Sequence, residues 1–218
     1  MKFTNCLFRA FALQSFIFVF MMSCNSNKAN PGNRTGLPDT LRSNEAVNPY
    51  VSADRSQMDM SYYPNDYPVL KMNGTDSVSL VARVIYSRPQ KKGRTIFGNT
   101  SASLCEYGKE WRLGANEATE LEFFEDVIIH GQRIDKGTYI IYCIPYQEKW
   151  TIILNTNLYT WGLHIDKAKD IFKIDVSAEL QVPSLEDFTM VFEKANYGVD
   201  LIMAWDKVKA TLPIRTTK

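Results

Sequence analysis

The stretch GTYIIYCIPYQEKWTIILN, residues 137–155, decides the fold class. Aromatic and β-branched residues fill its two arms, Thr138–Ile144 and Trp150–Asn155, and a short polar segment separates them. This composition favours β-strands over helices. The second arm is apolar at nearly every position from Trp150 to Leu154, which is typical of a strand buried on both faces. The stretch therefore predicts two strands, the second of them inside the protein.

Similar segments recur on both sides of this stretch, each bounded by turn residues. Gly131-Gln132 and Tyr197-Gly198 predict tight turns. Ile165–Ile171 and Leu104–Glu110 are the only helical candidates, and both are short. The other expected strands are Val78–Ser87, Thr119–Phe124, Val127–His130, Phe172–Val176, Phe188–Glu193, Val199–Trp205 and Val208–Ile214. Many short strands predict an all-β fold: an antiparallel, jelly-roll-like β-sandwich with one or two short helices.

Residues 1–23 predict a bacterial lipoprotein signal peptide. Lys2 and Arg9 come before or at the start of an apolar stretch, Ala10–Met22, and Cys24 follows shortly after it. A membrane-spanning helix needs roughly 20 apolar residues, and this stretch has about 13. We therefore expect Cys24 to be lipidated and to anchor the mature chain to a membrane. The alternative is an ordinary cleaved signal in which Cys24 has no role.

Two further regions follow the signal. Residues 24–56 are rich in Asn, Pro, Ser and Gly, and they predict a flexible polar tether because they cannot bury enough apolar surface to fold. Residues 57–218 are aromatic and β-branched, and their length suits one domain with its own core. We expect an outer-membrane lipoprotein of the cell envelope, with the periplasmic face favoured over the cell surface.

The charge balance argues against nucleic acid as a partner. The chain has 25 Lys and Arg residues against 24 Asp and Glu residues, so its formal net charge is +1. Loss of Lys2 and Arg9 with the signal changes this value to −1, which provides no basic field for a polyanion. Cys105 and Cys143 remain in a compartment that permits disulfides, and they either pair or stay as buried thiols.

A cationic loop follows the expected strand that ends at Ser87. Four cations fall within seven residues, and Pro89 and Gly93 impose a turn that gathers them. Arg88 and Arg94 carry planar guanidinium groups that suit carboxylate, phosphate or sulfate. The alternative is a solvated turn whose charges protect a sheet edge.

A second polar loop, residues 107–117, combines an aromatic residue with Arg, Asn and Glu between glycines. Trp111 and Arg112 together with Asn116 provide plausible ligand-binding chemistry. The alternative is structural: Trp111 fills the core while Arg112 bonds loop carbonyls and Glu117. The residues alone leave both possibilities open.

Other chemistry has weaker support. His130 and His164 have no Cys, His or Asp at ligand spacing, so we expect no metal site and no cofactor. No nucleophile elbow, zinc-protease motif, phosphate loop or dinucleotide fingerprint is present. Glu117 is a candidate acid or base for a hydrolase acting on envelope glycans or peptides. Trp150, Trp161 and Trp205 are expected in or beside the core.

The two loops carry a family resemblance, as do motifs further along the chain. The quoted motifs are Tyr86-Ser87-Arg88-Pro89, Lys92-Gly93-Arg94, Tyr107-Gly108, Trp111-Arg112, Gly114-Ala115-Asn116-Glu117, Gly137-Thr138-Tyr139, Ile144-Pro145, Trp150-Thr151, Trp161-Gly162, Ala204-Trp205 and Leu212-Pro213. Together they resemble the bacterial domain-of-unknown-function family 2911 over roughly residues 60–214. The resemblance implies a secreted or lipidated protein, but it implies no activity or ligand. The segment from Asn99 to Cys105 looks longer than usual, and Cys143 is an uncommon residue at its position.

These observations lead to one main hypothesis and two alternatives. The main hypothesis is a non-catalytic, lipid-anchored module that binds an anionic or sugar ligand, or an envelope protein. The alternatives are a hydrolase that uses Glu117 and a purely structural lipoprotein. The candidate ligand-binding residues are Arg88, Lys92, Arg94, Trp111, Arg112, Asn116 and Glu117.

Overall fold

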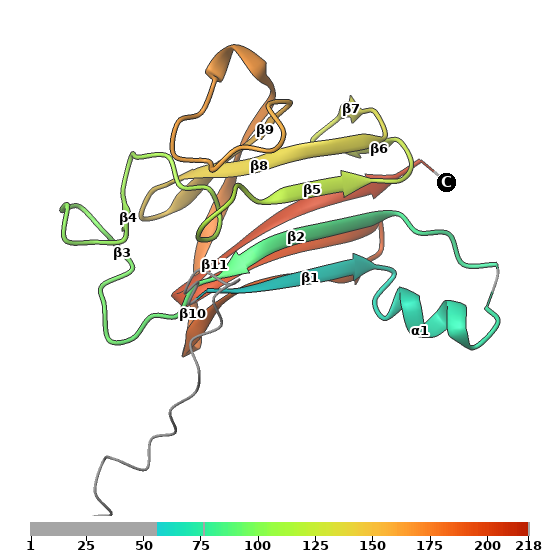
Figure 1. Ribbon diagram of the computed structural model, residues 1–218, viewed down its shortest axis with the longest axis horizontal. Helices are drawn as coiled ribbons and strands as arrows, with labels where there is room; N and C mark the ends of the chain where they lie inside the picture. Colours follow the sequence, from blue (N-terminus) through green and yellow to red (C-terminus); the bar gives the residue numbers. More distant parts are fainter. Residues whose placement is uncertain (1–55, 76, 218) are drawn as a thin grey trace, which may run out of the picture. The chain divides into compact units, whose positions relative to one another are not determined.

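The computed structural model describes residues 56–75 and 77–217 (Figure 1). The predicted signal peptide, the lipidation site Cys24 and the predicted tether up to residue 55 lie outside the described residues. Among the residues that are described, no helix is long and apolar enough to cross a membrane.

The fold is built almost wholly from antiparallel strands. Nine strands form one continuous sheet in the order β1-β2-β5-β8-β9-β10-β11-β6-β7. Two short strands, β3 and β4, pair in parallel as a separate small sheet. The strands are β1 (Gln57–Tyr63), β2 (Ala82–Arg88), β3 (Phe97–Gly98), β4 (Cys105–Glu106), β5 (Glu120–Phe123), β6 (Val127–Ile129), β7 (Gln132–Ile134), β8 (Gly137–Pro145), β9 (Lys149–Asn155), β10 (Asp170–Ala195) and β11 (Gly198–Thr216). The all-β, antiparallel prediction is confirmed.

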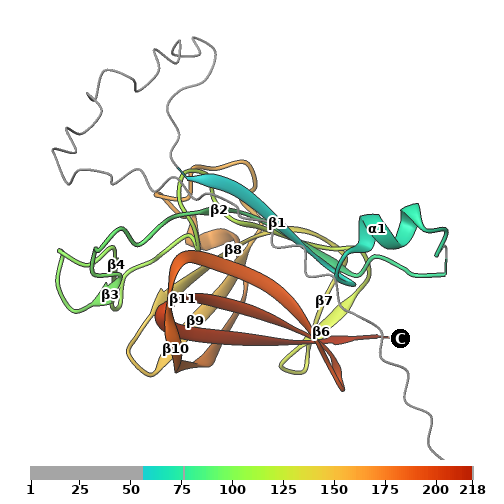
Figure 2. The same ribbon diagram turned by 90° about the horizontal axis from the view of Figure 1, so that it is seen from below.

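Helical structure is limited to two short pieces in the described residues. Helix α1 (Tyr67–Met72) joins β1 to β2 outside the sheet, as Figures 1 and 2 show. A 3₁₀ turn at Lys167–Lys169 lies inside the predicted helical segment Ile165–Ile171. The other predicted helix, Leu104–Glu110, is wrong, because this segment holds the two-residue strand β4 and a turn.

The long hairpin of β10 and β11 lets the single sheet fold over into two layers. The first part of β10 pairs with β9 as far as Ser177, and from Ala178 onward β10 pairs with β11. The register of β10 against β11 shifts around Leu185, and Asp206 of β11 has a φ of 52°. Such irregularities bend a strand and increase its twist. The far part of the hairpin therefore packs under β1 and β2.

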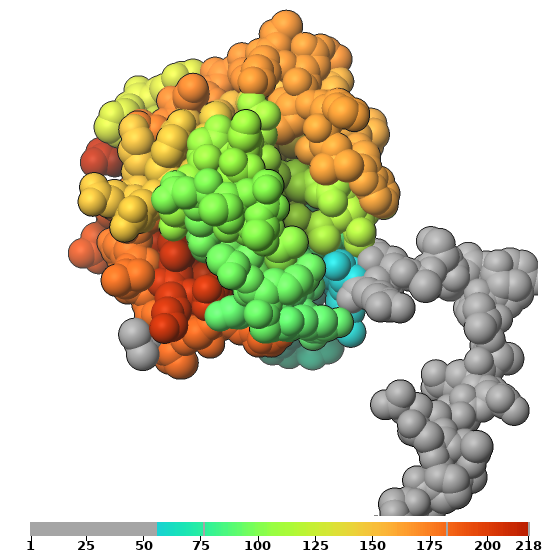
Figure 3. Space-filling model, turned by 90° about the vertical axis from the view of Figure 1, so that its left-hand side faces the viewer, coloured from blue at the N-terminus to red at the C-terminus, as the bar shows by residue number. Residues whose placement is uncertain are grey.

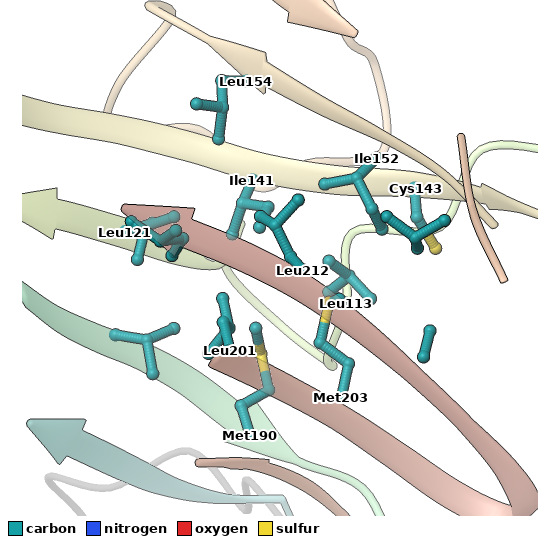
Figure 4. Close-up of a cluster of buried hydrophobic side chains, with 14 of the residues drawn as sticks. Leu113, Leu121, Ile141, Cys143, Ile152, Leu154, Met190, Leu201, Met203 and Leu212 are labelled. Atoms are coloured by element: carbon teal, nitrogen blue, oxygen red, sulfur yellow. The ribbon is translucent and has the colours of Figure 1, made fainter. Parts of the chain in front are cut away.

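The core lies between these layers. The rings of Tyr86 from β2 and Phe188 from β10 meet edge to face, with centroids 5.6 Å apart. Figure 4 shows apolar side chains from both layers pointing toward one another; they include Leu121, Ile141, Ile152, Met190, Leu201, Met203 and Leu212. Burial of such surface stabilises the fold by about 25 cal/mol per Å².

The stretch that decided the fold class forms the hairpin β8–β9. Its strands pair from Ile140 with Asn155 to Pro145 with Trp150. Residues 150–155 are all buried, as the run of apolar residues predicted. The turn between β6 and β7 falls at His130 and Gly131, whose φ angles are 48° and 81°. This is one residue earlier than predicted, because both central residues of such a turn need positive φ.

Four of the predicted strands merge into two long strands in the structure. The segments Phe172–Val176 and Phe188–Glu193 belong to one strand of 26 residues, β10. The segments Val199–Trp205 and Val208–Ile214 belong to one strand of 19 residues, β11. The polar residues at the bends suggested strand ends. In the structure, bulges bend each strand at these residues and its pairing resumes beyond them. Strand β1 was not predicted.

Candidate functional site

Residues 89–119 connect β2 to β5 and cover one end of the sandwich. Figure 3 faces this end and shows the green connection next to the orange loop of residues 156–169. Inside the connection, β3 and β4 pair through Phe97 with Cys105 and Gly98 with Glu106. Both predicted polar loops belong to this one connection, so the fold places them close together.

Trp111 holds the second loop to the core. Its main chain exchanges two hydrogen bonds with Cys143 of β8, of 2.8 and 2.9 Å. Its indole Nε1 donates to the carbonyl oxygen of Gly114 at 3.2 Å. Trp111 as a whole residue is only 9% exposed. Its centroid lies 4.9–5.8 Å from the rings of Phe97, Trp150, Phe188 and Trp205.

A cavity of about 340 Å³ lies between the two polar loops, and we call it the loop pocket. Of the seven predicted site residues, three line it: Arg94, Trp111 and Arg112. Glu110 and the partly exposed Leu104 and Leu163 also line the loop pocket. The loop pocket therefore joins two guanidinium groups to an apolar surface.

Main-chain carbonyl groups hold both arginines of the loop pocket in place. The Nε of Arg94 donates to the carbonyl of Lys91 at 3.1 Å, and one of its Nη groups donates to the carbonyl of Gln90. The Nη1 of Arg112 donates to the carbonyl of Trp161 at 2.6 Å. A guanidinium has five N–H donors. Each arginine therefore keeps donors that have no partner in the described part of the chain.

Trp161, Glu117 and Gly162 also affect the position and the pKa of Arg112. Its guanidinium carbon lies 5.6 Å from the ring centroid of Trp161, a cation–π contact. Partial burial lowers the pKa of Arg112, and the nearby charge of Glu117 acts in the opposite direction. Gly162 makes this contact possible, because a Cβ there would lie 3.1 Å from Cβ and Cδ of Arg112.

The carboxylate of the loop pocket is already paired. Glu110 Oε1 lies 2.5 Å from Nζ of Lys167, which belongs to the 3₁₀ turn. This hydrogen bond and ion pair raise the pKa of Lys167. Because Lys167 compensates Glu110, the charge that remains at the pocket wall is that of Arg94 and Arg112.

Arg88 lies elsewhere and connects three strands. Its Nη1 lies 3.0 Å from Oδ2 of Asp59 on β1, and its Nη2 lies 3.9 Å from Oδ2 of Asp187 on β10. Tyr86 donates to the same Asp59 oxygen at 3.1 Å. Arg88 does not line the loop pocket.

The three remaining predicted residues also lie outside the pocket lining. Lys92 is exposed, with a φ of 47°, and its backbone N–H donates to Glu186 Oε1 at 2.7 Å. Asn116 is half-buried, with a φ of 60°, a conformation that Asn tolerates better than most residues. Glu117 is exposed. Of these three residues, Glu117 lies near an arginine of the pocket, where its charge acts on the pKa of Arg112.

Sequence reasoning missed the contribution of the loop between β9 and β10. Trp161 was expected in or beside the core, but it is 54% exposed and stacks on Arg112. Lys167 and Leu163 of the same loop were not singled out. The dipeptide Trp161-Gly162 was the available signal, because a glycine next to a tryptophan allows close approach to another chain segment.

Cys105 and Cys143, the cysteines within the described residues, are buried free thiols. Burial raises the pKa of both Cys105 and Cys143, and Cys105 also raises that of Cys143. A thiol held protonated in this way is a poor nucleophile and metal ligand. Among the described residues, no three His, Cys, Asp or Glu side chains gather in a way that could hold a metal ion.

Comparison with known proteins agrees with the resemblance seen in the two loops. Neither the curated proteins nor the solved structures contain a significant match to this chain. A family model described as "Protein of unknown function (DUF2911)" matches residues 71–214, which is more than half of the chain. The matched range includes the whole loop pocket except Ser56. The chain therefore belongs to the DUF2911 family.

Proposed function

We propose that this protein is a lipid-anchored, non-catalytic module of the cell envelope that binds a small anionic ligand in the loop pocket. The ligand carries a carboxylate, phosphate or sulfate group, and acidic sugars are included. One observation carries the proposal: Arg94 and Arg112, from two separate loops, line the same cavity.

The chemistry of the wall suits such a ligand. A guanidinium fork matches the geometry of carboxylate and phosphate oxygens, and partial burial strengthens the interaction. Leu104, Leu163 and Trp111 provide an apolar surface for the body of the ligand. The volume of about 340 Å³ lies within the usual range of small-molecule sites.

The pocket chemistry favours binding over catalysis. Glu110 is paired with Lys167, and Cys105, which also lines the pocket, is kept protonated by burial. A thiol held protonated by burial is a poor nucleophile. The carboxylate of Glu110 is already engaged by Lys167.

The anchor is the second part of the proposal. The order of a basic start, an apolar stretch and Cys24 supports lipidation. Membrane fractionation and mass spectrometry of the purified full chain test it. We expect acyl chains on Cys24 and release of a Cys24→Ala variant from the membrane fraction. An unmodified N-terminus at another residue would contradict the anchor but leave the loop pocket unaffected.

Titration calorimetry with defined probes tests the ligand class. We expect glucuronate, phosphate or sulfate to bind the full chain, and we expect glucose to bind at least tenfold more weakly than glucuronate. Arg94→Gln and Arg112→Gln should each weaken binding at least tenfold. Arg133→Gln is the matched control, because Arg133 carries the same charge on β7 and does not line the loop pocket. Failure of all three anions to bind, or equal binding by Arg112→Gln, would refute the proposal.

A further inference from the structure

The pairing of β10 with β11 ends inside the sheet. Their ladder stops at Ala178 opposite Ala210. From this point the first part of β10 continues beside β9, while the end of β11 pairs with β6 at Arg215 and Thr216. Figure 1 shows the orange start of β10 and the red end of β11 running in different directions. We call the space between residues 171–177 and residues 211–215 the strand gap.

Main-chain groups of β10 point into the strand gap. In an antiparallel sheet, the N–H and C=O of one residue point to one neighbouring strand, and those of the next residue point to the other side. The N–H of Ala178 donates to Glu148, on the β9 side. The groups of Lys173, Asp175 and Ser177 therefore point away from β9, toward the gap. No strand of the described chain pairs with them there.

The wall that β11 contributes is poorer in donors. Lys209 pairs with Glu179 across the last part of the ladder, so the main-chain groups of Thr211 and Pro213 continue on the gap side. Proline has no N–H, so Pro213 removes one donor from this wall. An incoming segment would therefore form most of its main-chain hydrogen bonds with β10.

The strand gap contains a cavity of about 440 Å³, which is separate from the loop pocket. Val176, Leu212 and Ile129, all buried, provide an apolar floor. His130 and Arg215 lie at the rim. This arrangement matches an extended peptide, whose alternate side chains point down to an apolar surface and up to solvent.

One amide already takes the position of a strand partner. The side chain of Gln132, at the start of β7, reaches across and its Nε2 donates to the carbonyl of Ile171 at 3.3 Å. A peptide N–H is the same kind of donor. The contact shows that the carbonyl of Ile171, on this edge of β10, points away from β9 and accepts from a donor on β7.

The charges at the rim define the partner further. Asp175 is paired with Lys149 at 2.6 Å, and Glu179 is paired with Lys209 at 3.1 Å. Arg215 forms no ion pair within the described residues and is exposed. The uncompensated charge at the cavity is therefore positive, and it complements an acidic side chain.

We infer that the strand gap accepts an extended segment of a partner protein, which adds as a strand to the free edge of β10. The segment alternates apolar and polar residues and carries an acidic residue near Arg215. Addition of a strand to a sheet edge is a common mode of peptide recognition. This inference does not depend on ligand binding in the loop pocket.

Hydrogen exchange on the purified full chain tests the free edge directly. Amides of Lys173, Asp175 and Ser177 should exchange at least a hundredfold faster than those of Ile174 and Val176, which point toward β9. Fragmentation mass spectrometry resolves single residues. Equal protection of both sets would mean that the edge is already covered, and the inference would fail.

A linear heptapeptide library displayed on phage tests the partner. We expect enrichment of alternating sequences with an acidic residue, and at least tenfold weaker binding of the selected peptides to a Thr211→Trp variant, in which the indole fills the gap. Lys207→Trp is the control, because Lys207 is exposed on the same strand and does not line the cavity. If the immobilised protein enriches no sequence over the support alone, the inference is refuted.

A change in the peptide avoids any doubt about the folding of the Trp variant. Methylation of alternate peptide nitrogens removes the donors that face β10 and leaves the side chains intact. We expect at least a tenfold loss of binding to the unmodified protein, and slower exchange of Asp175 and Ser177 with the parent peptide. Unchanged binding of the methylated peptide would show a side-chain site, and would contradict strand addition.

Discussion

Two arginines at the same end of the sandwich show how differently one residue type is used. Arg88 ends strand β2 and reaches carboxylates on two other strands, Asp59 and Asp187. Arg112 lies in a loop and is held by a carbonyl and the ring of Trp161. The charge of Arg88 is compensated inside the fold. The charge of Arg112 forms no ion pair in the described residues, so a ligand can compete for it.

The largest effect on stability should come from Trp111, which packs the second polar loop against the core. Trp111→Ala removes an indole that packs against four aromatic rings, and we expect it to lower the free energy of unfolding by about 3–5 kcal/mol. Urea unfolding measures this change. Trp161→Ala is the control, because Trp161 is 54% exposed and should cost less than about 1 kcal/mol. Similar costs for both would contradict the anchoring role of Trp111.

Alkaline pH should loosen the region around Arg88. Burial, followed by smaller effects that include the charge of Asp59, raises the pKa of Tyr86 from 10.0 to about 12. The unfolded phenol loses its proton first, so stability is complete below pH 10 and falls as the pH rises toward 12. The maximum loss is about 2.7 kcal/mol for a shift of two pKa units.

Unfolding curves at several pH values check the contribution of this tyrosine. In a Tyr86→Phe variant the loss between pH 10 and 12 should be smaller by up to that amount. An identical pH dependence in both proteins would show that Tyr86 does not titrate with unfolding.

Substitution of the two arginines tests the comparison itself. Arg88→Gln removes the positive partner of Asp59, which also accepts from Tyr86, and we expect a loss of about 1–2 kcal/mol. The same change in Arg112 should cost less than about 0.5 kcal/mol, because its main contact is one carbonyl at the surface. Urea unfolding of both variants measures the difference. A larger loss for Arg112→Gln would reverse the assignment.

The smallest change in stability should accompany the largest change in binding. Arg112→Gln is expected to melt within about 3 °C of the unmodified chain, while its affinity for glucuronate or phosphate falls at least tenfold. Thermal unfolding without an anion gives the melting temperature. Repeating it with each anion at 10-fold excess over the protein gives the shift that reports binding. A variant that loses stability but keeps its affinity would place Arg112 among the structural residues.

The fold was predictable where its signals are local. The hairpin of residues 137–155 and the all-β class follow from composition and from runs of apolar residues. Strand β1 was missed although Gln57–Tyr63 alternates polar and apolar residues, because Gln, Asp, Ser and Met are not residue types enriched in strands. Its pairing with β2 depends on contacts such as Tyr86 with Asp59, which lie 27 residues apart in sequence.

The candidate site was predictable in part for the same reason. Arg94, Trp111 and Arg112 belong to one connection, so their closeness could be expected from the sequence. The roles of Arg88 and Trp161 could not be, because each depends on partners from distant strands and loops. Arg88 meets Asp59 from 29 residues earlier, and Arg112 bonds Trp161 from 49 residues later. Spacing along a chain carries no signal for such contacts.

The hairpin of β10 and β11 has a consequence for how the protein is made. The final residues of β11, Arg215 and Thr216, complete the sheet beside β6, whose residues are made almost ninety positions earlier. A nascent chain that lacks this last strand has an open core, since Leu212 and Ile214 are both buried in it. The domain can therefore close only once the residues up to Thr216 are present.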